Sequence, residues 1–283
     1  MTAPNAPDPR YIAARRVLLD ALEALAPHGP AFILVGAQAV YLRTGESDLA
    51  IAPYTTDGDL ALDPRLLGDE PTIATAMHNA GFTLDAPPGT QPQPGIWRTT
   101  VTIAGETFIV PVDLIVPEAA SSGQGNRGAR LGPHGNRAAR RAVGLEAALI
   151  DHDHLLITAL DPDDPRALSA EVAGVTALLV AKLHKINDRV TSGRPDRQSD
   201  KDAADIYRIM QTASLTTVTA TLEQLREHPL TANVTNQALH HLADLFGRRA
   251  SPGVQMAQRA LRLAIDDTQI ATLCVTFTRS IGA

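Results

Sequence analysis

The chain has very little cysteine and no long apolar run. Cys274 is its one cysteine, which excludes an intramolecular disulfide and a cysteine-rich zinc site and fits a reducing cytosol. No apolar run approaches the ~20 residues that a membrane-spanning helix needs. The N-terminal stretch MTAPNAPDPRYIAARR also lacks the apolar segment of a secretory signal. We therefore expect a cytoplasmic protein without a membrane span.

An excess of basic charge is lacking too. The sequence has 25 Lys and Arg residues against 31 Asp and Glu residues, a net charge of -6, which argues against a general nucleic-acid binder but leaves room for local basic patches. At 283 residues, of which 44% are hydrophobic, the chain is long enough for two domains with a sizeable core. The pattern changes near Asp161 and predicts an α/β part at 1–160 and an all-helical part at 161–283.

The stretch from Ala31 to Asp63 combines the parts of a phosphate site and a metal site. An apolar strand ends at Gly36, a short helix follows, and a later strand carries Asp57 and Asp59. Glycine lets the backbone N–H groups at a helix start approach an anion closely. The two Asp residues are two apart on a strand, so they point to one side and can share a divalent cation. Taken alone, Asp57-Gly58-Asp59 is explained about equally well as a polar turn.

A third carboxylate is expected in a neighbouring strand. Ala104-Gly105-Glu106 separates two β-branched runs and predicts a hairpin with arms at 97–103 and 107–116. The second arm, FIVPVDLIVP, places Asp113 inside an apolar run, where a charge is costly unless it is paired or binds a metal. Three carboxylates on adjacent strands can hold two Mg²⁺ ions for chemistry on a nucleoside triphosphate. We therefore predict that Asp57, Asp59 and Asp113 form one acidic cluster.

The helical part begins with a long amphipathic pattern. Apolar residues from Leu168 to Val190 recur at steps of three or four, which predicts one long helix starting near Asp164-Pro165. Lys182, Lys185 and Arg189 form a basic stripe along it. A helix opened by Ser199, and further helices at about 215–227, 233–247, 251–264 and 267–280, fill the rest of the chain.

In this order, Gly36-Ala37, Asp57-x-Asp59 and Asp113 resemble the polymerase-β-like nucleotidyltransferase superfamily. Further along, LLVAKL at 178–183 and KDAADIY at 201–207 look like the lysine helix and the (Arg/Lys)-Asp-x-x-Asp-(Leu/Ile) segment of AbiEii-type proteins. Those proteins are the nucleotidyltransferase toxins of type IV toxin–antitoxin systems. The resemblance covers about residues 31–212. It implies an α+β fold, with a mixed sheet and flanking helices followed by an all-helical domain.

The resemblance also implies an activity. Such an enzyme moves an NMP from an NTP to an acceptor hydroxyl and releases pyrophosphate, with Mg²⁺ held by Asp57, Asp59 and Asp113. The implied partners are the NTP, a tRNA or another RNA as acceptor, and a cognate antitoxin. Ala37 and Gln38 replace the family's second glycine or small polar residue, so a phosphate contact at Gly36 and Ala37 would come from backbone N–H groups. Two alternatives stay open: an enzyme that modifies a small molecule such as an antibiotic, and a catalytically inactive module that binds nucleotides or other proteins.

Roles in the helical part follow from the same resemblance, each beside a plainer alternative. Lys182 would contact the triphosphate, with Lys185 beside it, whereas the alternative for the stripe is a solvated basic face. Asp202 matches the last catalytic position of the family, but Ser199-x-x-Asp202 also fits a helix-capping pattern. Asp205 is the other candidate for the functional carboxylate.

Two further groups of residues lie outside these motifs. His152 and His154 alternate on an expected strand like metal ligands, but the sequence offers no third ligand nearby, so we expect exposed polar positions. The Arg- and Gly-rich segment 123–141 is either a grip for RNA or nucleotide phosphates or a mobile connection.

Overall fold

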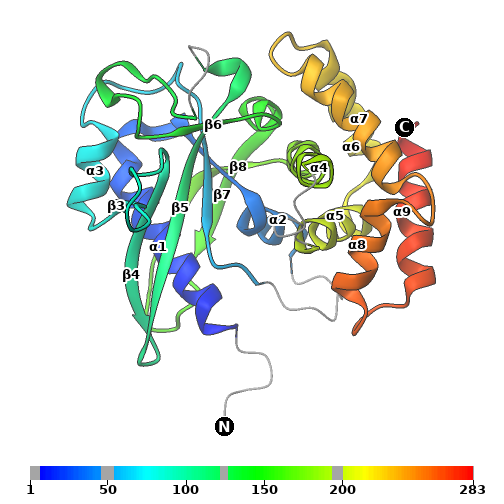
Figure 1. The fold of residues 1–283 in the computed structure, drawn as a ribbon, viewed down its shortest axis with the longest axis horizontal. Coiled ribbons are helices and arrows are strands. Elements are labelled where there is room, and N and C mark those ends of the chain that lie inside the picture. The colour runs from blue at the N-terminus through cyan, green and yellow to red at the C-terminus, as the bar shows by residue number, and fades with distance from the viewer. Residues whose placement is uncertain (1–6, 46–53, 122–126, 193–199, 283) are drawn as a thin grey trace. The chain divides into compact units, whose positions relative to one another are not determined.

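The computed structural model describes residues 7–45, 54–121, 127–192 and 200–282. Ser199 and the start of the segment 123–141 lie outside these ranges. The chain divides into two compact units. The first takes in the described residues of 1–39, 53–142 and 152–173, and the second takes in those of 40–52, 143–151 and 174–283. The first unit contains the β-sheet, and the second contains the helices of the C-terminal part of the chain (Figure 1).

A mixed sheet forms the centre of the first unit. Its strand order is β3-β4-β5-β2-β1-β8-β7, with β6 added beside β5. The pairs β1–β8, β2–β5 and β5–β6 are parallel, and the remaining pairs are antiparallel. This sheet and the helical C-terminal region confirm the predicted α+β class. The strands are β1 (Phe32–Val35), β2 (Gly58–Leu62), β3 (Thr83–Leu84), β4 (Ile96–Ile103), β5 (Glu106–Pro117), β6 (Arg140–Ala142), β7 (His152–Thr158) and β8 (Ala167–Ala173).

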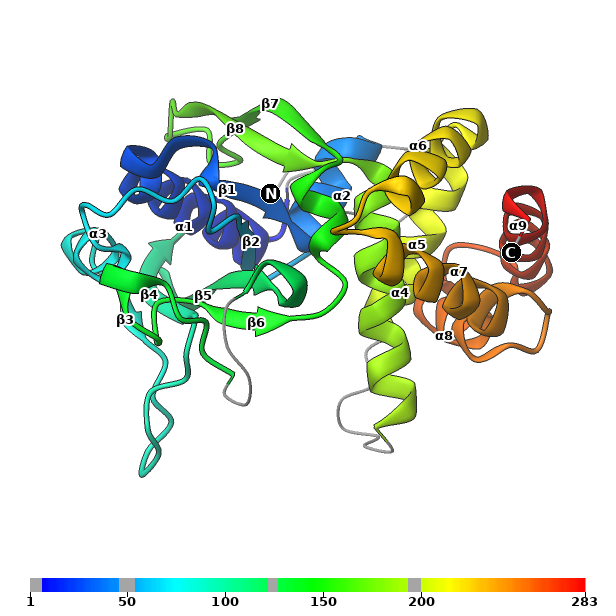
Figure 2. The ribbon, with the colours of Figure 1, turned by 90° about the horizontal axis from the view of Figure 1, so that it is seen from above.

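Helix α1 (Pro9–Leu25) covers the sheet by packing on β2, β4 and β5, with α3 (Ile73–Asn79) beside it (Figure 2). The Asp8 side chain caps its first turn by accepting a hydrogen bond from the backbone N–H of Arg10 at 2.8 Å. Its apolar side, including Leu18, is fully buried, as is Trp97 of β4. The sequence predicted the β4–β5 hairpin, and the structure confirms it.

The long helix predicted from Pro165 begins only at Val175, which corrects that prediction. Residues Ala167–Ala173 are strand β8, the second arm of a hairpin with β7. Leu168 and Val172 belong to this strand. They are four residues apart, and a step of four stays on one face of a helix but, being even, also on one face of a strand. The apolar spacing therefore could not separate the two structures.

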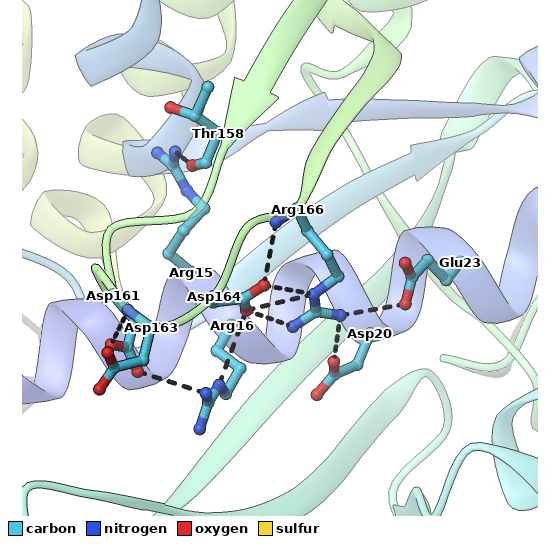
Figure 3. Close-up of polar contacts among 9 residues, drawn as sticks. All are labelled: Arg15, Arg16, Asp20, Glu23, Thr158, Asp161, Asp163, Asp164 and Arg166. Atoms are coloured by element: carbon cyan, nitrogen blue, oxygen red, sulfur yellow. Dashed lines mark hydrogen bonds and ion pairs between the residues drawn. The ribbon is translucent and has the colours of Figure 1, made fainter.

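Ion pairs connect the turn between β7 and β8 to α1 (Figure 3). Arg166 bonds the Asp164 carboxylate within the turn at 2.7 Å and reaches Asp20 of α1 at 2.6 Å. Arg16 of α1 completes the connection by pairing with Asp161 at 3.3 Å. Asp164, predicted to cap a helix, instead orders this turn.

The second unit is a bundle in which α4 contacts α5, α6 and α7, and α5 contacts α8 and α9. α4 buries Leu179, Leu183 and Ile186, as the amphipathic pattern predicted. In the part of the chain that the structure describes, no helix has the length and apolar character of a membrane span. The helices are α2 (Gly36–Thr44, at the boundary between the units), α4 (Val175–Thr191), α5 (Lys201–Thr212), α6 (Leu215–Glu227), α7 (Ala232–Phe246), α8 (Pro252–Leu261) and α9 (Asp267–Ile281). Short 3-10 turns occur at Ala26–Ala31, Glu118–Ala120, Gly132–His134 and Glu146–Leu149.

Candidate functional site

Strands β1 and β2 bring Gly36 and Asp59 into direct contact. The antiparallel register places Val35 opposite Asp59, and Gly36 follows as the first residue of α2. Gly36 has a φ of +72°, in the region that favours glycine. A Cβ atom on residue 36 would lie 2.9 Å from both Cβ and Cγ of Asp59, and closer still to its Oδ2. The missing side chain therefore lets the Asp59 carboxylate lie against the start of α2.

Asp57 precedes β2 and is fixed at both its backbone and its side chain. The Gln38 side chain, 1% exposed, donates from Nε2 to the Asp57 carbonyl oxygen at 2.9 Å. The Thr55 hydroxyl donates to the Asp57 carboxylate. Gln38, which the sequence comparison treated only as a departure from a phosphate-binding motif, therefore positions a candidate metal ligand.

The buried guanidinium of Arg15 bonds Gln38, the residue that bonds the Asp57 backbone. Arg15 of α1 donates from Nε to the Gln38 Oε1 atom at 2.7 Å, and also bonds the Thr158 carbonyl oxygen at 2.8 Å and the Tyr11 hydroxyl at 3.2 Å. Burial lowers the pKa of Arg15. These hydrogen-bond partners are all neutral, so, among the residues that the structure describes, the Arg15 guanidinium bonds no carboxylate and lies two hydrogen bonds from the Asp57 backbone.

Asp113 lies beside Asp59 in the sheet but binds an arginine. The parallel register of β2 and β5 pairs Asp59 with Asp113. Arg140 of β6 donates from Nη2 at 2.7 Å and from Nε at 3.2 Å to the Asp113 Oδ2 atom. The side chains of Asp113 and Arg140 are 20% and 30% exposed. The sequence predicted that a charge at this position needs a partner, and the structure provides Arg140.

This arrangement bears on the metal that the resemblance implies. Among the residues that the structure describes, no group of three His, Cys, Asp or Glu side chains is placed to hold a metal ion. Asp57 and Asp59 carry the oxygen donors that Mg²⁺ prefers, and the Asp59 carboxylate lies against Gly36. Asp113, already bound by Arg140, does not fit as a third ligand in the same arrangement.

The basic stripe of α4 meets the acidic residues of α5 inside the helical unit. Lys182, 4% exposed, places its Nζ atom 2.7 Å from Asp202 Oδ1 and 2.6 Å from Asp205 Oδ2. Lys185 lies 3.3 Å from Asp202, and Arg189 also pairs with it. Burial opposes the charge on Lys182, but the two carboxylates outweigh it and raise its pKa. For Asp202, burial is likewise outweighed by the surrounding cations, so its pKa is lowered.

No protein-family model and no curated protein matches this chain. Among solved structures, the chain is similar to one titled "Crystal structure of putative nucleotidyltransferase from H. pylori". The two are 11% identical, the match covers 96% of this chain and 94% of that chain, and the TM-score is 0.35. A likeness this distant supports no conclusion about activity.

His154 is exposed, as we expected, and His152 is partly buried, and both bond one carboxylate that the sequence did not predict. Glu171 of β8 lies opposite His154 in the hairpin register. Its two carboxylate oxygens bond His152 Nδ1 at 2.8 Å and His154 Nε2 at 2.9 Å. His154 and Glu171 also line a groove of about 370 Å³ near the end of α1. Sequence reasoning missed Glu171 because it assigned that segment to a helix, where no cross-strand partner exists.

Proposed function

We propose that this protein is a nucleotidyltransferase that moves an NMP from an NTP to an acceptor hydroxyl and releases pyrophosphate. The observation that carries the proposal is the contact between Asp59 and Gly36. It puts a carboxylate directly beside a helix start, where backbone N–H groups favour an anion. A carboxylate alone would repel a triphosphate, so a site that combines the two features calls for a cation between them.

The site residues of the first unit have the following roles in this proposal. Asp57 and Asp59 hold Mg²⁺, which when bound neutralises charge on the triphosphate. The backbone N–H groups at Gly36 and Ala37 take a phosphate group. Gln38 keeps Asp57 in place through the hydrogen bond at 2.9 Å. The arrangement that the sequence predicted, with Asp113 as a third ligand for two ions, is the competing version of this site.

The roles that the resemblance assigns to the helical unit need a separate argument. Two of the three N–H groups of Lys182 already point at Asp202 and Asp205. We therefore propose that Lys182 and Asp202 mainly stabilise the helical unit. Lys185, whose side chain is 44% exposed, is the better candidate for a phosphate contact.

For the acceptor, we propose a hydroxyl at the end of an RNA, with tRNA as the leading case. Support comes from the exposed arginines between β5 and β6, Arg127, Arg130 and Arg137, because cations on one segment can contact successive phosphates. With an RNA acceptor, the chain would act as a toxin-like enzyme in the cytoplasm and be paired with a cognate antitoxin.

The test is incubation of the purified chain with each of the four NTPs, labelled at the α-phosphate, together with total RNA and Mg²⁺. We expect label to enter RNA from one or two of the NTPs, and EDTA to abolish the transfer. Asp59→Asn should be inactive while keeping its fold by circular dichroism. Absence of transfer with every NTP, to RNA and to aminoglycoside acceptors alike, would contradict the proposal.

A second candidate function is nucleotide binding without catalysis, and one observation favours it. Arg140 neutralises Asp113, a residue that the resemblance assigns to catalysis. The same assay decides the matter, since a binding module would retain an NTP and release no pyrophosphate.

A further inference from the structure

The position of Arg140 is fixed by a close approach of three backbone segments. Gly95 has a φ of +74°, and a Cβ atom there would lie 2.6 Å from the Leu114 carbonyl oxygen and 2.9 Å from the Ala139 carbonyl carbon. The Leu114 N–H in turn donates to the Gly95 carbonyl oxygen at 2.8 Å. β6 can therefore lie in parallel beside β5 just beyond Ile96, where β4 begins. This packing holds the backbone of Arg140 opposite Ile115, two residues along β5 from Asp113 and on the same face of the strand, so that the two side chains can meet.

The chemistry of the pair is that of a permanent counter-ion. Arg140 directs both Nε and Nη2 at one oxygen of Asp113, and a guanidinium stays charged at any pH at which the protein is folded. An ion bound at Asp113 would need that same oxygen or would lie next to the guanidinium charge. Either costs binding energy, because like charges a few Å apart repel.

We propose that Arg140 is the resident cation of the candidate site and takes the charge-balancing place of a second metal ion at Asp113. The site then binds a single divalent ion through Asp57 and Asp59. This inference rests on the proposed function only in assuming that Asp57 and Asp59 bind a metal ion. It makes Asp113 a partner of Arg140 rather than a metal ligand.

The experiment is a titration of the purified full chain with Mn²⁺, followed by calorimetry. We expect one ion per chain. Asp113→Asn, which keeps the side-chain volume, should change the dissociation constant by no more than about twofold, whereas Asp59→Asn should weaken binding on the order of tenfold or more, because ligand charge sets affinity. Arg140→Met should add a second ion or tighten the first, since it frees the Asp113 charge.

Arg137→Met is the matched control, because it removes the same charge from the same segment, and the Arg137 side chain bonds Gln91 instead of Asp113. It should leave both stoichiometry and affinity unchanged. Two ions bound by the wild type, or equal losses from Asp113→Asn and Asp59→Asn, would overturn the inference. The Asp113→Asn arm decides the question even if Arg140→Met does not fold.

The outcome separates this inference from the proposed function. If the chain binds one ion in the expected pattern and transfers no label from any NTP, the proposed function fails and the role of Arg140 stands. If label is transferred but Asp113→Asn abolishes Mn²⁺ binding, the transferase stands and the role of Arg140 fails.

Discussion

The carboxylate of Asp59 fills the space that a side chain on Gly36 would need. Gly36→Ala should therefore destabilise the protein through left-handed strain of about 1–2 kcal/mol and a further ~1–3 kcal/mol from overpacking against Asp59. Nucleotidyl transfer should be lost at the same time, because Asp59 must move. Gly89→Ala is the control: Gly89 has a φ of +75° and nothing within 4 Å of its missing Cβ, so it carries only the strain. Urea denaturation of both variants measures the difference, and equal losses would show that the contact with Asp59 is unimportant.

A similar contact between a glycine and an aspartate occurs at the start of α4, where the aspartate caps the helix. Gly174 precedes α4, and a Cβ atom there would lie 2.5 Å from Asp151 Oδ2, which accepts a hydrogen bond from the Ala177 N–H at 2.8 Å. Asp151 thus caps α4 from another segment. A glycine–aspartate contact at a helix start can therefore serve capping alone, and this is the alternative that Asp59 must be tested against.

Asp59→Asn separates capping from metal binding, because asparagine caps a helix about as well as aspartate but binds divalent ions more weakly. If Asp59 is a metal ligand, the variant should lose Mg²⁺-dependent activity while its free energy of unfolding changes by less than about 0.5 kcal/mol. Asp151→Asn should leave both activity and stability near wild type. Full activity in Asp59→Asn would mean that Asp59 only caps α2.

Gln38→Ala should reduce both stability and activity. The change leaves buried hydrogen-bonding groups without their partner, at a cost of about 1–3 kcal/mol; the groups concerned are the Arg15 Nε–H and the carbonyl oxygens of Asp57 and Ala14. It also frees Asp57, so kcat should fall more than the NTP affinity. Gln91→Ala is the comparison, because the Gln91 side chain is exposed and accepts a hydrogen bond from the exposed Arg137 side chain. Denaturant titration and steady-state kinetics check the two parts, and an unchanged kcat would remove Gln38 from the site.

The fold was largely predictable where the apolar period was unambiguous. The helices α6 to α9 are long enough for the period of 3.6 residues to exclude strands, and β1, α2 and the β4–β5 hairpin carried clear glycine turns. β8 was mistaken because Leu168 and Val172 fit both periods. What would have distinguished it is its pairing with β7 and β1, a long-range contact that local spacing does not encode.

For the candidate site, the residue types were predictable and their partners were not. Asp57, Asp59 and Asp113 stood out because carboxylates next to apolar strands need a reason to be there. Arg140 lies 27 residues after Asp113 and can bond it because Gly95 lets the backbone near Arg140 approach β5 closely. Gln38, in turn, looked in the sequence like a substitution in a phosphate-binding motif. A sequence gives the charges that need compensation, whereas the choice among many possible partners is made by tertiary packing.

Lys182→Met should strongly destabilise the helical unit. Removing this cation takes a partner from two buried carboxylates, Asp205 and Asp202, although Asp202 keeps Lys185 and Arg189. Breaking a comparable buried ion pair costs about 3–5 kcal/mol. Lys185→Met, one turn away and partly exposed, should cost no more than about 1 kcal/mol. Adding Asp202→Asn and Asp205→Asn to Lys182→Met should recover much of the loss. Thermal unfolding measures all of these variants, and a Tm of Lys182→Met close to wild type would favour the triphosphate contact instead.

The turn between β7 and β8 should make stability depend on pH through Asp164. Hydrogen bonds from the Arg166 side chain lower the pKa of Asp164 from 3.8 to about 2. The folded state thus binds this proton more weakly than the unfolded state, so the pair stabilises the fold above pH 3.8 and loses this contribution as the pH falls toward 2. Asp164→Asn should lower the free energy of unfolding on the order of 1–2 kcal/mol at pH 7, and the gap to wild type should close as the pH falls from 5 toward 2. Urea titrations across this range measure the gap, with Asp163→Asn as a control that removes the same charge from an exposed neighbour. A gap that stays constant with pH would mean that Asp164 acts through its backbone geometry and not through its charge.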